Sequence, residues 1–143
     1  NQEFIIGKAL LLNEGTDVSI FATGHMVWKV IEAGHVLASK GISVEIINIH
    51  TIKPLDEEAV LSSVAKTKCV VTAEEHQIAG GLGESISQLL ARRMPTPMEF
   101  VAVNDSFGES GTPEQLMTKY GLDSVNIVEA VERVIARVDK QLV

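Results

Sequence analysis

The run Val18-Ser19-Ile20-Phe21-Ala22 is the segment that decides the fold class. It is short, rich in apolar and β-branched residues and followed by a turn signal, as is typical of a buried β-strand. Similar runs lie at residues 44–49, 69–73 and 100–103, and the first three recur about every 26 residues. Because each gap is long enough for one helix, the alternation predicts βα units around a mainly parallel sheet.

Apolar residues at helical spacing fill the gaps between these runs. The first such pattern begins at Met26, and Gly41 is expected to end the helix. Asp56 is a suitable N-cap for a second helix, because its carboxylate can accept a hydrogen bond from an unpaired backbone N–H. The other helices are predicted after the glycine turn at 80–83, near 112–121 and over 127–142.

A further apolar run at residues 8–12 precedes the first βα unit. Asn13-Glu14-Gly15 is a turn signal between this run and the next, which predicts a hairpin. Residues 8–12 are therefore expected to form an antiparallel edge strand beside residues 17–22. The predicted fold is a single α/β domain over residues 1–143, with three α/β/α layers and a five-stranded mixed sheet whose first strand is antiparallel.

Composition and charge exclude several classes of function. The chain has 143 residues and a formal net charge of −7, which disfavours binding to nucleic acid or to anionic membranes. No apolar run approaches the ~20 residues that span a bilayer, and no signal peptide opens the chain, so we expect a cytoplasmic protein. Its start at Asn1 rather than Met suggests a fragment. The one cysteine, Cys69, is expected to be a buried hydrophobe rather than a reactive thiol.

The glycine turn Gly80-Gly81-Leu82-Gly83 is the first candidate for a ligand site. It lacks the dinucleotide-binding spacing, because Ile86 stands where the third glycine is required. Two interpretations stay open. Either the glycines allow a tight turn that packs closely on the sheet, or the helix N-terminus binds an anion directly. Glu84 disfavours the second, because its carboxylate would repel a phosphate.

Polar residues follow the predicted strands and form a candidate rim, of which Glu74-Glu75-His76 is the most distinctive part. Since ligands and partners meet the carboxyl ends of strands in open α/β sheets, these side chains are expected to share one edge. The rim could serve acid–base catalysis by His76, a divalent metal, a solvated surface or contacts with another domain, and we favour the last. The candidate residues are Thr23, His25, His50, Glu74, Glu75, His76, Gly80, Gly81, Gly83 and Asp105.

Three blocks of sequence together resemble the C-terminal domain of transketolases. The first block contains Asp17-Val-Ser-Ile-Phe-Ala-Thr-Gly24, Gly41-Ile-Ser-Val-Glu-Ile-Ile-Asn48 and Thr51-Ile-Lys-Pro-Leu-Asp56. The second contains Val70-Val-Thr-Ala-Glu-Glu-His76 and Gly80-Gly-Leu-Gly-Glu84, and the third Val103-Asn-Asp-Ser-Phe-Gly108 and Gly111-Thr-Pro-Glu-Gln-Leu116. The same domain occurs in deoxyxylulose-5-phosphate synthase and in 2-oxo-acid dehydrogenase β subunits. His76 favours transketolase. The third block, which also includes Lys119-Tyr-Gly121, resembles in particular the split, two-subunit forms of transketolase.

The resemblance implies a transferase that moves a two-carbon ketol unit between sugar phosphates in the pentose phosphate pathway. Thiamin diphosphate and Mg²⁺ would be held by the pyrophosphate- and pyrimidine-binding domains, which are the implied partners. The Gly-Asp-Gly motif of the cofactor site does not occur in this chain. No catalytic, cofactor-binding or metal-binding residue is therefore assigned here. The chain is expected to support assembly, to form part of a homodimer and to be inactive in isolation.

A hypothesis of another class is a free-standing regulatory α/β module that binds a small metabolite at the glycine turn and the rim. A third stays within the family and assigns the chain to a 2-oxo-acid dehydrogenase β subunit or to deoxyxylulose-5-phosphate synthase. The block that contains His76 argues against this third hypothesis.

Overall fold

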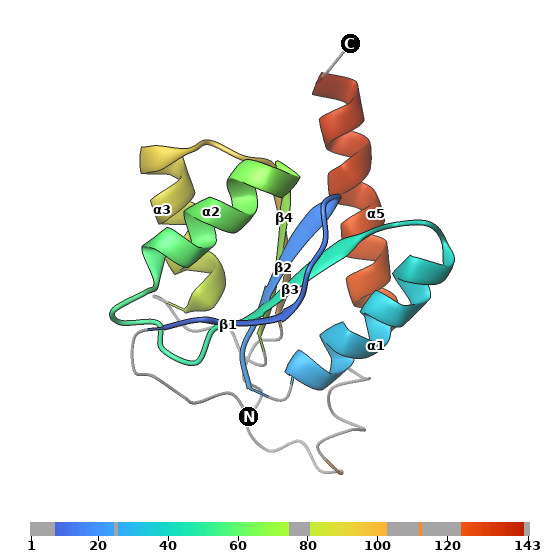
Figure 1. Ribbon diagram of the computed structural model, residues 1–143, viewed down its shortest axis with the longest axis horizontal. Helices are drawn as coiled ribbons and strands as arrows, with labels where there is room; N and C mark the ends of the chain where they lie inside the picture. The colour runs from blue at the N-terminus through green and yellow to red at the C-terminus, as the bar shows by residue number, and fades with distance from the viewer. Residues whose placement is uncertain (1–7, 25, 75–80, 103–111, 113–123, 142–143) are drawn as a thin grey trace.

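The fold is a five-stranded sheet between two pairs of helices, as a computed structural model shows (Figure 1). The structure describes residues 8–24, 26–74, 81–102, 112 and 124–141. The short helix predicted near 112–121 falls outside these residues, except for Thr112. The strands are β1 (Leu10–Asn13), β2 (Val18–Ala22), β3 (Val44–Asn48), β4 (Val70–Glu74) and β5 (Met98–Ala102). The helices are α1 (Met26–Ser39), α2 (Glu57–Thr67), α3 (Leu82–Arg93) and α5 (Ser124–Gln141).

The sheet has the order β1-β3-β2-β4-β5, and β2 to β5 run parallel. β1 is an edge strand and runs antiparallel to its neighbour β3. The predicted fold class is thus confirmed. The apolar runs at 18–22, 44–49, 69–73 and 100–103 form the four parallel strands, with ends that differ by one or two residues.

One expected pairing was wrong, because β1 lies beside β3 rather than beside the strand at 17–22. Both edges of β2 are taken by parallel neighbours, which leaves no edge for a hairpin partner. The connection instead crosses the amino end of β3, where Asn13 Nδ2 donates to the Val44 carbonyl at 2.7 Å and the Asp17 N–H donates to the Ser43 carbonyl at 2.8 Å. Gly15 makes the crossing possible, because a Cβ there would lie 2.2 Å from the carbonyl carbon of Val44.

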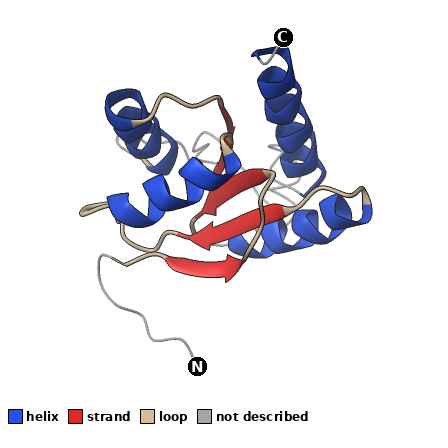
Figure 2. Ribbon diagram, turned by 45° about the horizontal axis from the view of Figure 1, so that its top comes forward, coloured by secondary structure: helices blue, strands red, loops and turns tan. Residues whose placement is uncertain are grey.

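The helices divide into two layers, one on each face of the sheet (Figures 1 and 2). α1 and α5 cover one face with a core that includes Met26, Val30 and Val131. α2 and α3 cover the other face with a core that includes Phe21 and Leu89. Helices join β2 to β3, β3 to β4 and β4 to β5, and α5 follows β5, so both faces of the sheet are covered and the β-branched strands are buried on both sides.

The helix ends agree with the signals in the sequence. Asp56 caps α2 as predicted, since its Oδ1 accepts from the Ala59 N–H at 3.2 Å, while its Oδ2 accepts from the Ala9 N–H at 2.9 Å. α1 ends at Ser39, two residues before the predicted stop at Gly41. The link from β3 to α2 contains a cis peptide bond between Lys53 and Pro54.

Cys69 is buried, as expected of a small hydrophobe. Its Sγ donates to the Asp17 carbonyl at 3.2 Å. Burial, with the nearby charges of Asp17 and Asp139, raises the pKa of the thiol to about 11. A thiol of that pKa is almost wholly protonated near neutral pH and is a poor nucleophile. Among the described helices, none is both long and apolar enough to cross a bilayer.

Candidate functional site

The carboxyl ends of three neighbouring strands are held side by side by backbone hydrogen bonds. The Ile49 N–H donates to the Ala22 carbonyl at 2.9 Å, and the Thr23 N–H donates to the Ala73 carbonyl at 3.2 Å. The chain leaves β2 for α1 on one face and leaves β4 for α3 on the other (Figure 1). This divergence makes a topological switch point, which is where open α/β sheets bind ligands or partners.

The structure places five of the predicted rim residues. Thr23 and Glu74 are half-buried and lie at the ends of the adjacent strands β2 and β4, whereas His50 is exposed just after β3. Gly81 and Gly83 lie at the start of α3. The other predicted residues lie outside the described residues, namely His25, Glu75, His76, Gly80 and Asp105.

Glu74 caps the N-terminus of α3 from the end of β4. Its Oε1 accepts from the Leu82 N–H at 3.0 Å and its Oε2 accepts from the Gly83 N–H at 2.7 Å. Gly81 occupies the N-cap position and has no side chain to do this. A carboxylate at this position satisfies two otherwise unpaired donors and is stabilised by the positive end of the helix dipole. The sequence pointed to Glu74 as a rim residue but did not reveal this contact.

Gly83 brings α3 close to the sheet directly beneath the Glu74 carboxylate. A Cβ at this position would lie 2.8 Å from the ring of Phe100 and 3.1 Å from Thr72 Oγ1. The glycine therefore serves close packing of helix on sheet, one of the two interpretations left open by the sequence. The other interpretation was direct binding of an anion at this N-terminus. Glu74 opposes it, because the N–H groups of Leu82 and Gly83 already donate to its carboxylate.

The start of α3 does not fit the diphosphate group of thiamin diphosphate. A diphosphate needs free N–H donors or cations, whereas the N–H groups of Leu82 and Gly83 already donate to the chain's own Glu74 carboxylate. Within the ranges that the structure describes, no group of three or more His, Cys, Asp or Glu side chains is placed to hold a metal ion. No cofactor chemistry is assigned to this rim.

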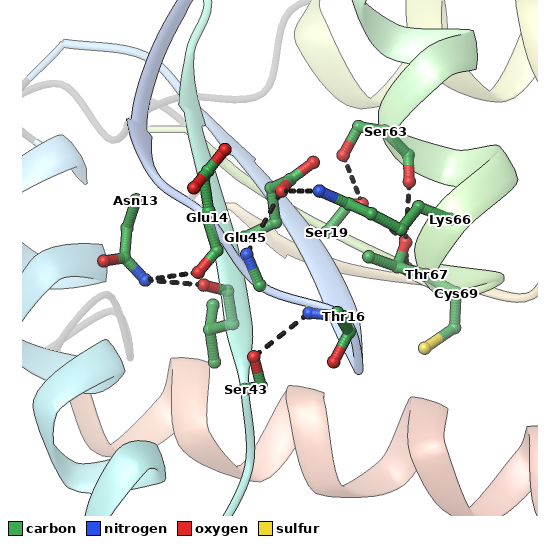
Figure 3. Close-up of polar contacts among 12 residues, drawn as sticks. Asn13, Glu14, Thr16, Ser19, Ser43, Glu45, Ser63, Lys66, Thr67 and Cys69 are labelled. Atoms are coloured by element: carbon green, nitrogen blue, oxygen red, sulfur yellow. Dashed lines mark hydrogen bonds and ion pairs between the residues drawn. The ribbon is translucent and has the colours of Figure 1, made fainter.

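A second polar cluster lies at the opposite, amino end of the parallel strands (Figure 3). Ser19 Oγ lies 2.6 Å from both Ser63 Oγ and Thr67 Oγ1, and all three residues are buried. The Thr67 hydroxyl also lies 3.3 Å from the Cys69 carbonyl. These hydroxyls satisfy one another between β2 and α2, which makes the group a structural contact rather than an exposed set of nucleophiles.

Glu45 extends this cluster and is the buried charge that sequence reasoning missed. Its carboxylate, 4% exposed, pairs with the Lys66 ammonium and accepts from the Gly15 N–H at 3.1 Å (Figure 3). Burial by itself would raise the pKa of Glu45, but hydrogen bonds from Lys66, Ser63 and Gly15 outweigh it, so the pKa is lowered. A charged residue inside the apolar run 44–49 was the available signal.

A pocket of about 300 Å³ lies over this ion pair, between α2 and the edge of the sheet formed by β1 and β3. Leu11 and Ile47 contribute apolar surface to it, and Glu45, Ser62 and Lys66 contribute polar atoms. The two charges in its wall already neutralise each other. The pocket therefore offers neither a net charge nor an activated group for chemistry.

Comparison with known proteins gives a consistent family match. Residues 7–127 match the family described as "Transketolase, C-terminal domain". The chain is 48% identical over 137 residues to the 6-deoxy-6-sulfo-D-fructose transketolase subunit SqwH of Clostridium sp. (strain MSTE9), which covers 96% of this chain and 42% of that relative. It is 40% identical over 129 residues to the 1-deoxy-D-xylulose-5-phosphate synthase of Caldanaerobacter subterraneus subsp. tengcongensis (strain DSM 15242), covering 90% of this chain and 21% of that enzyme.

The fold match agrees with the sequence match. A solved structure described as "Split gene transketolase, inactive beta4 tetramer" superimposes with a TM-score of 0.88 and 41% sequence identity. The match covers 94% of this chain and 44% of that chain. The chain thus spans about two fifths of the SqwH relative and of the split transketolase chain that it matches.

Proposed function

The chain belongs to the transketolase C-terminal domain family, and from that premise we propose that it supplies the C-terminal part of a split transketolase. The assembled enzyme would transfer a two-carbon ketol unit between sugar phosphates. Thiamin diphosphate and Mg²⁺ would be bound by pyrimidine- and pyrophosphate-binding domains carried by the rest of the enzyme. The present domain would support their assembly as a homodimer in the cytoplasm.

The observation that carries the proposal is the likeness to parts of split transketolases. The chain is 48% identical to the SqwH transketolase subunit over 96% of its own length, and 41% identical, with a TM-score of 0.88, to a chain described as a split gene transketolase. The described rim agrees with a supporting role, because Glu74 uses its carboxylate to cap α3 and not to face a ligand. A domain of this kind contributes rigidity and contact surface, while the reacting groups come from elsewhere.

A second candidate within the family is a part of 1-deoxy-D-xylulose-5-phosphate synthase. It is favoured by the synthase of Caldanaerobacter subterraneus, whose 40% identity to this chain approaches the 48% of the SqwH subunit.

The free-standing metabolite-binding module has less support. It relies on the glycine turn, and two N–H groups of that turn are hydrogen-bonded to Glu74.

Reconstitution tests the proposal. A chimera would replace the matched 42% of the SqwH subunit with this chain, and it would be combined with the remaining subunit of that enzyme, thiamin diphosphate and Mg²⁺. We expect the chimera to transfer a ketol unit from 6-deoxy-6-sulfo-D-fructose, the ketose for which the SqwH subunit is named, to an aldose phosphate. The matched control is the unmodified SqwH subunit in the same mixture. A chimera that assembles with the remaining subunit and yet shows no ketol transfer would contradict the proposal.

A further inference from the structure

The edge strand β1 is held to the domain far more lightly than the strands beside it (Figure 1). Leu10 and Leu12 are half-buried and Leu11 and Asn13 are exposed, whereas every residue of β2 is buried. The pairing of β1 with β3 is also irregular, because the register shifts between Leu11 and Asn13. A strand with little burial and a short, irregular ladder is expected to open locally at low free energy. We call residues 9–15, which contain this strand, the strap.

Two carboxylates hold the two ends of the strap. At one end, the Ala9 N–H donates to Asp56 Oδ2 at 2.9 Å. At the other end, the Gly15 N–H donates to Glu45 Oε1 at 3.1 Å. Both carboxylates also contact α2, since Asp56 caps that helix and Glu45 pairs with Lys66 (Figure 3). The strap is therefore connected to α2 through one acidic side chain at each end.

The middle of the strap is separated from α2 by the pocket of about 300 Å³. Ala9, Leu11 and Ile47 line the pocket from the strap and β3. Ala59 and Ser62 line it from α2. Atoms that face each other across a pocket make few dispersion contacts, so packing adds little to the attachment of the strap to α2. The contacts at the two ends then carry most of this attachment.

The strap adjoins a residue that is fixed to the sheet. The Asp17 N–H donates to the Ser43 carbonyl at 2.8 Å, and Asp17 Oδ2 accepts from the Ser43 N–H at 2.6 Å. β2 begins at the next residue and is paired along both of its edges. The strap can therefore lift as far as Thr16 without disturbing the parallel sheet.

We propose that the strap opens and closes as one unit while β2 to β5 stay folded, and that Asp56 and Glu45 are the two groups that hold it closed. Opening would free the outer edge of β3 and one wall of the pocket. The two end contacts should be coupled, because the segment between them has too little burial to keep its place when one end is released. The inference is independent of the proposed function, since it uses contacts within this chain alone.

Native-state hydrogen exchange of the 143-residue chain, followed by NMR at increasing urea concentrations below the unfolding transition, tests the proposal. The amides of Ala9 and Gly15 report on the strap, and those of Ser19 and Val70, which donate to backbone carbonyls of the parallel sheet region, report on the rest. We expect the strap amides to be about 100-fold less protected or more, with a small dependence on urea. The sheet amides should show the large urea dependence of global unfolding.

Two variants test the coupling of the ends. Asp56→Ser keeps a good N-cap for α2, but its single, shorter oxygen cannot also hold the strap. Glu45→Gln removes the charge and weakens the acceptor at the other end. We expect each variant to speed exchange about tenfold at both Ala9 and Gly15, including the end that it does not touch. The control Glu57→Gln removes a carboxylate of α2 that pairs with α3 instead, and it should change neither strap amide.

The outcomes decide between one unit and separate contacts. Faster exchange at both ends in Asp56→Ser, with Ser19 and Val70 unchanged, supports the proposal even if Glu45→Gln fails to fold. Acceleration confined to the end whose carboxylate was altered would show that the ends open separately and would overturn it. Strap amides that exchange only through global unfolding, with the urea dependence of the sheet amides, would overturn it as well.

Discussion

The two ends of the parallel sheet use polar residues in different ways. At the amino end, Ser19, Ser63 and Thr67 bond to one another, and Glu45 is paired with Lys66 beneath the surface. At the carboxyl end, polar residues follow each strand, and Glu74 makes one internal contact that orders the start of α3. The polar residues at the amino end are therefore buried and bonded to one another, whereas those at the carboxyl end lie partly at the surface.

The contrast teaches which polar groups are available for recognition. A buried hydroxyl or carboxylate that has its partners within the domain contributes to stability and specificity of packing. Half-buried or exposed groups at a switch point, such as Thr23 and His50, keep surface for contacts with other molecules. Substitutions at the amino end should therefore lower the free energy of unfolding more than substitutions at the carboxyl end.

The largest effect is expected from Gly15→Ala at the amino end. The new Cβ would lie 2.2 Å from the Val44 backbone, which cannot move aside without displacing β3. We expect a loss of about 4 kcal/mol or more in the free energy of unfolding, or failure to fold. Urea denaturation monitored by circular dichroism measures this loss. The control is Gly41→Ala, whose Cβ would meet no atom within 4 Å, so that it carries only the backbone strain of a positive φ. Equal, small losses in both variants would contradict the crossing described for residues 13–17.

Glu45→Gln is expected to cost about 2 kcal/mol at pH 7, because it weakens the buried acceptor for the Gly15 N–H and removes the partner of Lys66, whose side chain is 44% exposed and can turn to water. The pKa of Glu45 is lowered on folding, so its contribution is present above the ordinary pKa of a glutamate and is lost as the pH falls through the folded value.

Denaturation between pH 7 and pH 3 checks this expectation. The difference in stability between the wild-type chain and Glu45→Gln should shrink as the pH falls. A difference that stays constant or grows over that range would show that the carboxylate is not held ionised by its neighbours.

Gly83→Ala at the carboxyl end should cost less than Gly15→Ala, about 1–2 kcal/mol. Its Cβ would meet the ring of Phe100, an exposed side chain that can turn away, at 2.8 Å. The double variant Gly83→Ala/Phe100→Ala should therefore lose less than the sum of the two single changes. Strict additivity in a double-mutant cycle would show that a Cβ at residue 83 does not contact the ring of Phe100.

The smallest effect, about 1 kcal/mol, is expected from Glu74→Gln. The amide has one acceptor oxygen in place of two and carries no charge, so one of the N–H groups of Leu82 and Gly83 loses its partner. Hydrogen exchange should become faster at these two amides and stay unchanged in α2. Uniform acceleration in both helices would mean that Glu74 acts on global stability and not on the start of α3.

Most of the fold could be predicted because it follows from local patterns. The β-branched runs and the helical spacing between them determine the βα units, and Asp56 identifies the start of α2. The neighbour of β1 could not be predicted, since it depends on the contact between Gly15 and Val44, 29 positions apart in the chain. A turn signal such as Asn13-Glu14-Gly15 shows that the chain changes direction and does not show which strand it reaches.

The candidate rim was predictable in part for the same reason. Residues that follow parallel strands share one edge, and this placed Thr23, His50 and Glu74 near one another without any contact being known. The capping of α3 by Glu74 required the geometry of the turn, because residue 74 precedes Leu82 by eight positions. The partner of Glu45 was also hidden, since Lys66 reaches it from a different element, although the position of Glu45 inside the apolar run 44–49 signalled its burial.

Calorimetric titration of the purified 143-residue chain with thiamin diphosphate and Mg²⁺ tests the central claim most directly. We expect no binding heat, because the N–H groups at the start of α3 donate to Glu74 and no group of three or more His, Cys, Asp or Glu among the described residues is placed to hold Mg²⁺. Saturable binding of the cofactor by this chain, at micromolar concentrations and with one site per chain, would contradict it.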